Sequence, residues 1–342
     1  MNGPRSTVYA KALLCALVAL LSACASTPEA WHLQGQAMGT SWHVTAYATD
    51  AQHTHLQSAI ESRLADLNQQ MSAWVPDSAL SHFNHAVAGE WVDMPSDLWR
   101  VLGHALQLAR ATDGAFDPTI APLVALWGFG LDGTARNTPP SAEEIAAARS
   151  KIGWQRLQLD HAKHRALQSG DITLDINALG PGYAVDAMAE LLDDAGIESY
   201  LVELGGEMRA RGLKPDGAAW RVAVESPDGR TEAGLDTIIA LRDRSVGTSG
   251  DYRVGFIHAG RRYSHTLDPR GGEPIEHALA AVSVIDVSTM AADAYAAALL
   301  VLGSEQGMAF ARQHHLAAVF TVRTRDGYQR LSTPQFELYR SP

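Results

Sequence analysis

Apolar residues recur at helical spacing in several stretches of this chain, and short apolar or alternating runs lie between them. Leu56, Ile60, Leu64 and Leu67 share one face of a helix that the pattern predicts over residues 54–71. The same spacing predicts further helices over residues 97–112, 183–195, 290–302 and 305–315, and one that begins at Ser141, a residue type that favours the helix N-cap.

The remaining patterned runs predict strands. They cover residues 41–48, 154–159, 172–176, 199–204, 220–225, 237–242, 253–258, 279–287 and 317–322. Strands and helices alternate without the regular strand–helix–strand repeat of a parallel sheet, and residues 131–141 read as a surface loop. The pattern therefore predicts an α+β fold in which helices cover antiparallel sheets.

The first residues predict a targeting segment and not a part of the fold. Arg5 and Lys11 precede a short apolar run, and Leu21-Ser-Ala-Cys24 follows it. A run this short is typical of a signal-peptide core and too short to span a membrane. Cleavage before Cys24 and lipidation of its thiol predict a lipoprotein; a secretory peptide with a chance cysteine is the alternative. Residues 1–23 are then the signal peptide, 24–37 a lipidated tether and 38–342 the folded domain.

Charge and cysteine content exclude several classes of protein. The chain has a net charge of −11, and residues 1–23 contain basic but no acidic side chains, so the remainder is more acidic still. Such a surface argues against a nucleic-acid partner. Cys15 leaves with the signal peptide and Cys24 carries the lipid, which excludes disulfides, thiolate catalysis and cysteine-ligated metals. Any bound metal must be held by oxygen or imidazole.

The segment 114–130 follows neither a helical period nor a strand alternation. Asp117 is its one carboxylate and precedes Pro118, which favours an extended backbone, while no Lys or Arg lies in the segment to pair with it. Trp127 and Phe129 lie between glycines. Two interpretations stay open at this point: a well-packed loop, which the composition favours, or the wall of a ligand site.

Three other segments hold candidate chemistry. At Leu174–Asp186 a predicted strand leads through a glycine-bearing turn into a helix, which suits a phosphate group, although neither a Walker nor a Rossmann spacing is present. His265 lies three residues before Asp268 among hydroxyl side chains, as a structural residue or as a base. Asp293 starts an apolar helix, where it either complements the helix dipole or offers Mg²⁺ a hard oxygen ligand; Ala297, one turn later, offers none.

Taken in order, the motifs resemble those of a known family. They are Met38-Gly-Thr, Met71-Ser-Ala-Trp, Gly114-Ala-Phe-Asp-Pro-Thr, Trp127-Gly-Phe-Gly, Gly182-Tyr-Ala-Val-Asp, Glu203-Leu-Gly-Gly-Glu, Thr248-Ser-Gly-Asp-Tyr and Ser264-His-Thr-Leu-Asp-Pro-Arg. In this order they resemble the FAD:protein FMN transferases, the ApbE family, once called thiamine-biosynthesis lipoproteins. The resemblance extends from Met38 to Gly303 and covers nearly the whole predicted domain.

The resemblance implies a T-fold-like single domain with an FAD cleft, lipid-anchored on the periplasmic side of a bacterial membrane. It implies an enzyme that cleaves FAD, its substrate, with the help of Mg²⁺. The FMN half moves onto a threonine of a target protein in a membrane redox complex, and AMP is released. Two alternatives remain: an FAD pyrophosphatase that yields FMN and AMP, as some relatives are, and a non-catalytic lipoprotein that binds or delivers FAD.

The resemblance also assigns residues to the site. The FAD-binding positions are Met38, Trp74, Ala115, Phe116, Asp117, Asp175, Pro181 and Leu267. The metal-binding positions are the carbonyl of Ala178, the carboxylate of Asp293 and residue Ala297. As catalytic groups we expect Asp293, through the metal, and His265 or a nearby carboxylate as acceptor of the threonine proton.

Four positions depart from the family pattern. Trp74 stands where relatives have Tyr, Ala79 where they have Glu, Pro181 where they have Lys or Glu, and Ala297 where they have Thr. Mg²⁺ keeps several waters, and a water can take the place of a threonine oxygen. The departures therefore predict weaker metal binding but do not by themselves imply an inactive enzyme, and those at Pro181 and Ala297 are the features that favour the non-catalytic alternative.

Overall fold

The computed structural model describes residues 29–48, 55–130, 136–224, 227, 237–252 and 254–341. The predicted signal peptide, Cys24 and part of the predicted loop at 131–141 lie outside the described residues. Within them, no helix is both long and apolar enough to cross a membrane.

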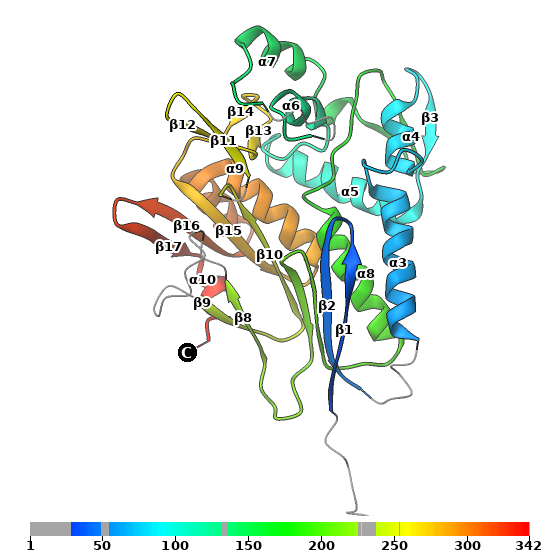
Figure 1. The fold of residues 1–342 in the computed structure, drawn as a ribbon, viewed down its shortest axis with the longest axis vertical. Coiled ribbons are helices and arrows are strands. Elements are labelled where there is room, and N and C mark those ends of the chain that lie inside the picture. Colours follow the sequence, from blue (N-terminus) through cyan, green and yellow to red (C-terminus); the bar gives the residue numbers. More distant parts are fainter. Residues whose placement is uncertain are drawn as a thin grey trace, which may run out of the picture.

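An eight-stranded antiparallel sheet runs through the molecule (Figure 1). Its strands follow one another in the order β1-β2-β6-β7-β10-β15-β16-β17, so that the N-terminal hairpin forms one edge and the C-terminal hairpin the other. The strands are β1 (Ala30–Ala37), β2 (Thr40–Tyr47), β6 (Tyr200–Leu204), β7 (Glu207–Arg211), β10 (Arg244–Gly250), β15 (Leu279–Asp286), β16 (Ala317–Thr324) and β17 (Gly327–Ser332).

Among the described residues, four small antiparallel sheets accompany the large one. They are formed by β3 (Trp91–Asp93) with β5 (Arg165–Leu167) and β4 (Gln158–Asp160), by β8 (Trp220–Val224) with β9 (Thr237–Leu241), by β11 (Gly255–His258) with β12 (Arg261–Ser264), and by β13 (Leu267–Asp268) with β14 (Glu273–Pro274).

The helices occur in every third of the chain and vary widely in length. They are α3 (Leu56–Met71), α4 (Ala79–His85), α5 (Ser96–Ala111), α6 (Ala121–Leu126), α7 (Ala142–Arg149), α8 (Gly180–Asp194), α9 (Thr289–Gln313) and α10 (Pro334–Glu337), with a 3₁₀ turn at Trp154–Arg156. At Ser141 the predicted N-cap forms a full capping box with Glu144.

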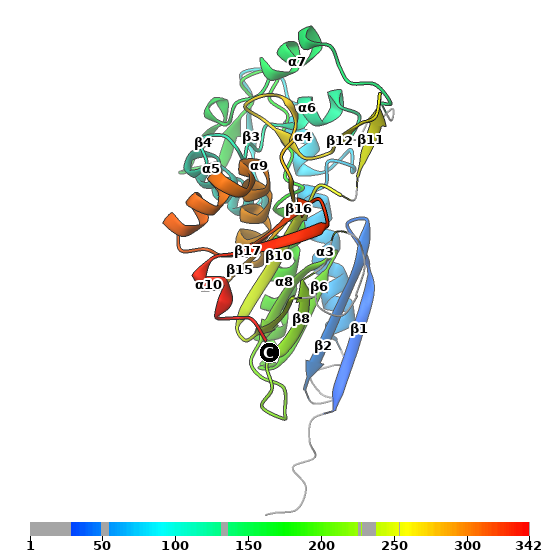
Figure 2. The same ribbon diagram turned by 90° about the vertical axis from the view of Figure 1, so that its left-hand side faces the viewer.

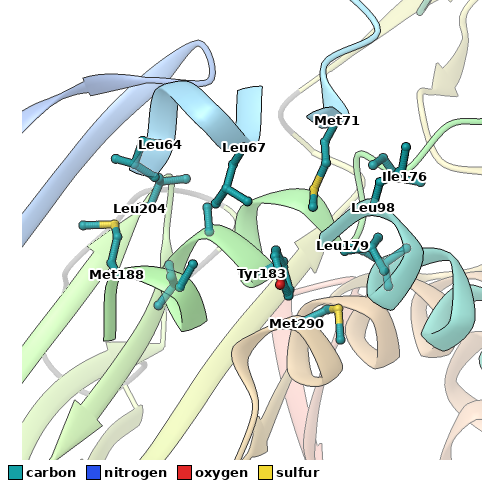
Figure 3. Packing of buried hydrophobic residues seen from close by; sticks show 14 of the residues in the cluster. Leu64, Leu67, Met71, Leu98, Ile176, Leu179, Tyr183, Met188, Leu204 and Met290 are labelled. Carbon is teal, nitrogen blue, oxygen red and sulfur yellow. The ribbon is translucent and has the colours of Figure 1, made fainter. Parts of the chain in front are cut away.

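Helices α3, α8 and α9 cover one face of the large sheet, and β8–β9 packs on part of the other (Figures 1 and 2). Between α3, α8 and the sheet, Leu64, Met188 and Leu204 belong to one buried cluster (Figure 3). On the opposite face, Ile239 of β9 packs against Val246 of β10. The α+β architecture, with antiparallel sheets covered by helices, is confirmed.

The periodic helices formed where the sequence predicts them. The four apolar positions that predicted α3 are all buried. Gly303, with φ 79° and ψ 176°, separates two helical halves of α9, as the two predicted helices required. A buried stripe at period 3.6 is a local property of the sequence, which explains why it could be recognised without tertiary information.

Two predicted strands are wrong in whole or in part. Residues 172–176 join no sheet. The side chain of Asn84 pairs with the backbone of Leu174 through N–H···Oδ1 at 2.8 Å and Nδ2–H···O at 3.1 Å, and Asp175 donates its N–H to the carbonyl of Pro118. The predicted strand 154–159 begins as the 3₁₀ turn and only then enters β4.

The boundary between tether and domain also differs from the prediction. Residues 30–37, assigned to the tether, form the edge strand β1 and pair with β2 along its full length. Strands β7, β10 and β17 were not predicted either. Their arginines, serines and glycines interrupt the apolar alternation, and they pair because their neighbours in the sheet supply the hydrogen-bonding partners.

Candidate functional site

A cleft of about 380 Å³ opens where three segments far apart in the sequence meet. The β1–β2 turn contributes Met38, the turn after α3 contributes Trp74, and the start of α8 contributes Pro181. The other residues that line it are Gly39, Asn68, Met71, Ser72, Val75, Ile176, Asn177 and Gly180. The fold therefore brings three of the predicted FAD-binding positions into one hollow.

The turn at Met38 is a two-residue hairpin connection with an unusual backbone. Met38 has φ 50° and Gly39 has φ 78°, between the paired residues Ala37 and Thr40. Both positive φ values match a type I′ turn, whose twist suits a tight hairpin. A non-glycine residue is rare there, and the turn holds the Met38 side chain over the helix start, with Cε 3.8 Å from where a Cβ of Gly180 would stand.

Trp74 offers a large apolar face at the rim of the cleft. Its side chain is 66% exposed, although tryptophan is usually well buried. Its backbone N–H donates to Ser72 Oγ at 3.1 Å, which orders the turn that carries it. An exposed indole beside a cleft is suited to stacking against a flat ring.

Asp293 lies at the start of α9 and meets the start of α8. Its carboxylate is nearly buried, and Oδ2 accepts the N–H of Gly182 at 3.2 Å. Burial raises the pKa of Asp293 to about 7, against the smaller opposite effect of this hydrogen bond. A buried carboxylate whose charge is offset by only a small hydrogen-bond contribution favours a cation nearby.

Two glycines allow this close approach. A Cβ at Gly182 would lie 2.6 Å from the carbonyl oxygen of Thr289 and 2.9 Å from Cβ of Asp293. A Cβ at Gly247 of β10 would lie 2.4 Å from the backbone nitrogen of Asp293. Helix α9 is thus seated on β10 and α8 at closer range than any side chain would permit.

The other two predicted metal positions lie on different elements. Within the described part of the chain, no backbone N–H donates to the carbonyl of Ala178, which lies just before α8 and beside the cleft residue Asn177. Ala297 is partly exposed and lies one turn after Asp293 on α9. Among the described residues, no group of three or more His, Cys, Asp or Glu side chains is arranged to hold a metal ion, so a cation at Asp293 would need carbonyl or water oxygens as further ligands.

The carboxylate of Asp117 is bound by its own segment and by the turn at Trp154. Asp117 Oδ1 accepts the N–H and the hydroxyl of Thr119 at 2.8 and 2.6 Å, and Oδ2 accepts the N–H of Trp154 at 3.0 Å. Burial raises the pKa of Asp117. Ala115 and Phe116 are buried as well, and none of the three lines the cleft. Packing thus accounts for their described contacts, and their role in FAD binding stays a prediction.

Asp175 links this segment to the cleft. Its N–H donates to the carbonyl of Pro118 at 2.8 Å, and its Oδ1 accepts the N–H of Asn177, a cleft residue, at 2.9 Å. Burial raises the pKa of Asp175. The loop of residues 114–118 therefore supports the segment that borders the cleft, even though it does not line the cleft itself.

His265 lies in a separate aromatic cluster. The Phe256 and Tyr263 rings stack at 5.0 Å, and Phe129 meets the edge of the His265 ring at 6.3 Å. His265 Nδ1 lies 3.2 Å from the carbonyl of Val254, and burial lowers the pKa of the imidazole. A carbonyl can only accept, so Nδ1 carries the proton and Nε2 keeps its lone pair.

Leu267 belongs to the same region and packs with Trp127. Trp127 is itself 2% exposed and donates its indole N–H to the carbonyl of Gly272 at 2.8 Å, so it is a core residue. Neither residue, nor His265, lines the cleft. Figures 1 and 2 place β11–β14 beyond the end of the large sheet at which the β1–β2 turn lies.

Sequence reasoning missed the polar side chains of the cleft. Asn68 lies at the end of α3 and Asn177 just before α8, and both line it beside Ser72. No periodicity marks these residues, because each lies at the end of an element. The glycine-bearing turn at 174–186 was the signal closest to them.

Comparisons with known proteins place this geometry in context. Residues 38–320 match the model of the ApbE family. A protein of Vibrio cholerae named FAD:protein FMN transferase is 36% identical, covering 94% of this chain and 96% of its own. A protein of Salmonella typhimurium with the same name is 35% identical and covers 97% of both chains.

Solved structures agree with the sequence relatives. The crystal structure of the flavinyl transferase ApbE from Pseudomonas stutzeri, in its apo form, superposes with a TM-score of 0.84. It is 41% identical and covers 91% of this chain and 97% of its own. An ApbE protein from Thermotoga maritima is 26% identical and still reaches a TM-score of 0.82.

Proposed function

The chain belongs to the ApbE family, and we propose that it is an FAD:protein FMN transferase. It would cleave the pyrophosphate of FAD, transfer FMN to a threonine hydroxyl of a target protein and release AMP. The observation that carries the proposal is the cleft itself, where Met38, Trp74 and Pro181 meet beside the start of α8, whose Gly182 N–H binds Asp293.

The cleft suits the two parts of a flavin nucleotide. The exposed indole of Trp74 offers a flat apolar face for a ring system. The first turn of α8 borders the same hollow through Gly180 and Pro181, and a helix N-terminus favours an anion such as a phosphate. Pro181 has no N–H to offer, so binding of a phosphate there depends on its neighbours.

The residues around Asp293 fit a magnesium ion. Asp293 provides a buried carboxylate, and its pKa is raised because the hydrogen bond from Gly182 does not offset the cost of burying its charge. The Ala178 carbonyl receives no backbone N–H within the described residues. Ala297 supplies no ligand, but its partly exposed position leaves room for water. When bound, Mg²⁺ would neutralise charge that develops on the pyrophosphate. Asp293 would hold it, and the α8 start would orient Asp293.

His265 is the residue best prepared to accept a proton. Its lowered pKa keeps the imidazole neutral at pH 7, and the hydrogen bond from Nδ1 to Val254 leaves Nε2 as the basic atom. We assign Nε2 to the proton of the incoming threonine hydroxyl. The ring of Phe129 packs against His265 in an edge arrangement, and Phe256 and Tyr263 continue the aromatic cluster behind it.

One incubation separates this function from its alternatives. The purified chain is mixed with FAD and Mg²⁺, with and without a threonine-bearing target protein of a membrane redox complex, and AMP and protein-bound flavin are measured. AMP that forms only with the target supports the transferase. AMP without the target indicates an FAD pyrophosphatase, and intact bound FAD indicates the carrier, which the departures Pro181 and Ala297 favour.

The role of Asp293 has its own test. Asp293→Asn keeps the shape and removes the charge, so we expect loss of Mg²⁺-dependent turnover. Asp97→Asn, the same change at another buried carboxylate, whose partners Arg63, Gln70 and Tyr183 lie outside α9, serves as the control. Unchanged turnover in Asp293→Asn would remove this residue from the reaction.

We also propose that the enzyme is lipid-anchored at Cys24 on the periplasmic side of a bacterial membrane. The support is the order of charge, apolar run and Leu-Ser-Ala-Cys in residues 1–24. Membrane fractionation of cells that express the full chain or Cys24→Ala tests it. The variant should lose both the lipid and the membrane association, and an equal membrane fraction for the two would contradict the anchor.

A further inference from the structure

Helices α8 and α9 cap each other through carboxylates. Asp293 of α9 accepts the N–H of Gly182 in the first turn of α8. In return Asp186, one turn after Gly182 on α8, accepts the N–H groups of Thr289 and Met290, the first residues of α9, at 2.9 and 3.1 Å. Gly182 and Asp186 are four residues apart and therefore share one face of α8. This face meets the first turns of α9, so that each helix offers a carboxylate to the N-terminus of the other.

Asp186 is more heavily bonded than a helix cap requires. Its carboxylate also accepts the hydroxyls of Ser288 and Thr289 at 2.7 and 2.9 Å, and the guanidinium of Arg209 on β7 at 2.7 Å. The residue as a whole is 7% exposed. Ser288 in turn accepts the N–H of Ala291 at 3.2 Å, so the whole first turn of α9 is bound.

We propose that Asp186 is a positioning residue, which fixes the first turn of α9 against α8 and β7 and thereby sets the place of Asp293 relative to the cleft. Asp293 lies four residues after Thr289, or about 6 Å along the helix. A displacement of the first turn is passed directly to Asp293, because no flexible segment lies between them. The proposal rests on the proposed function, since it takes Asp293 as the group that holds the cation.

The structure offers a matched control for a loss of stability alone. Asp97 is equally buried and also binds a guanidinium, that of Arg63, at 2.7 Å through both oxygens. Its further bonds go to Gln70 and to the hydroxyl of Tyr183, and none of these partners is on α9. Asp97→Asn should therefore weaken the fold without moving the start of α9.

The experiment compares Asp186→Asn with Asp97→Asn in the full-length protein, well below the melting temperatures of both. Mg²⁺ binding is measured by calorimetry with the metal alone, and FAD binding by flavin fluorescence with and without Mg²⁺. In Asp186→Asn an amide NH₂ meets backbone and hydroxyl donors. We expect Mg²⁺ affinity and the Mg²⁺-dependent part of FAD affinity to fall about tenfold or more, as when residues that orient metal ligands are changed.

Asp97→Asn should melt earlier and bind both ligands as the wild type does. Excess Mg²⁺ should rescue turnover of the Asp186→Asn variant, because this variant keeps the carboxylate of Asp293 and only displaces it. Equal Mg²⁺ and FAD affinities in the two variants would overturn the proposal. So would a wild-type protein that shows no response to Mg²⁺.

A second pair of variants covers the case in which Asp186→Asn does not fold. Thr289→Val removes the hydroxyl that bonds to Asp186, whereas Ser245→Ala removes the 2.9 Å contact of the same hydroxyl with Ser245 and leaves Asp186 bonded. Only Thr289→Val should weaken Mg²⁺ binding. If the wild type binds FAD with Mg²⁺ but transfers no FMN, the proposed function fails, and these binding comparisons still decide the role of Asp186.

Discussion

The crossing of α8 and α9 leaves no room for a side chain at residue 182, and Gly182→Ala tests this directly. The new methyl group would lie 2.6 Å from the carbonyl oxygen of Thr289, 2.8 Å from Cα of Met290 and 2.9 Å from Cβ of Asp293. All three belong to α9, and two are backbone atoms that cannot rotate away. Ordinary van der Waals contact therefore requires α9 to move by somewhat under 1 Å.

Two opposing effects set the change in the free energy of unfolding. Alanine is the better helix former by about 1 kcal/mol. Overpacking a close helix crossing costs about 1–3 kcal/mol, and more where backbone must move. We therefore expect Gly182→Ala to lower the free energy of unfolding by about 1–2 kcal/mol net of both effects. Activity should suffer more, because a displacement of about 1 Å near reacting groups costs roughly a hundredfold in rate.

Gly103→Ala in α5 is the matched control. It makes the same substitution inside a helix, but nothing lies within 4 Å of the added methyl group. It should raise stability by about 0.5–1 kcal/mol and leave turnover unchanged. Urea unfolding and AMP release from FAD with Mg²⁺ measure both quantities. A Gly182→Ala protein as stable and as active as Gly103→Ala would refute the argument that this crossing positions Asp293.

Three further predictions concern other parts of the molecule. Asp97→Ala leaves the Arg63 guanidinium without its buried partner and should cost about 3–5 kcal/mol in urea unfolding; a loss below 1 kcal/mol would show that the network is dispensable. Trp74→Ala should weaken FAD binding, measured by flavin fluorescence, by up to about tenfold, and Trp74→Tyr should retain most of it; equal affinities in all three would exclude stacking on the indole. Because burial lowers the pKa of His265, transfer should fall with decreasing pH only below the ordinary histidine value of about 6.5, and this acid limb should vanish in the residual activity of His265→Gln. A pH–rate profile of wild type and variant measures it, and the same limb in both would assign the titration to another group.

Local sequence patterns predicted some elements of this chain correctly and others wrongly. The spacing of Leu56, Ile60, Leu64 and Leu67 predicted α3, because a buried stripe repeats every turn wherever the helix packs. The same kind of evidence failed at residues 172–176, whose apolar alternation is that of a strand. There the side chain of Asn84 forms the hydrogen bonds with the backbone of Leu174 that a neighbouring strand would otherwise form. An apolar alternation shows which side is buried, and it does not show what pairs with the backbone.

The candidate site divides in the same way. The ordered motifs indicated the family and with it a flavin nucleotide, and the fold brings Met38, Trp74 and Pro181 together in one cleft. The segment 114–130 carried the most unusual composition. The carboxylate of Asp117 accepts hydrogen bonds from Thr119 and Trp154, and Trp127 lies in the core. An unusual composition marks a constrained segment, whether the constraint comes from a ligand or from packing.

The amino-acid sequence by itself determined the longer helices, about half of the strands, the α+β class and the family, because each of these depends on residues close together or on motifs in order. Only the tertiary structure decided that residues 38, 74 and 181 share one hollow, and that α8 and α9 exchange the carboxylates of Asp186 and Asp293. The physical reason is distance along the chain. More than a hundred residues separate Gly182 from Asp293 and Asp186 from Thr289, and no local pattern records which backbone N–H groups a carboxylate will meet once the sheet has brought the two helix N-termini together.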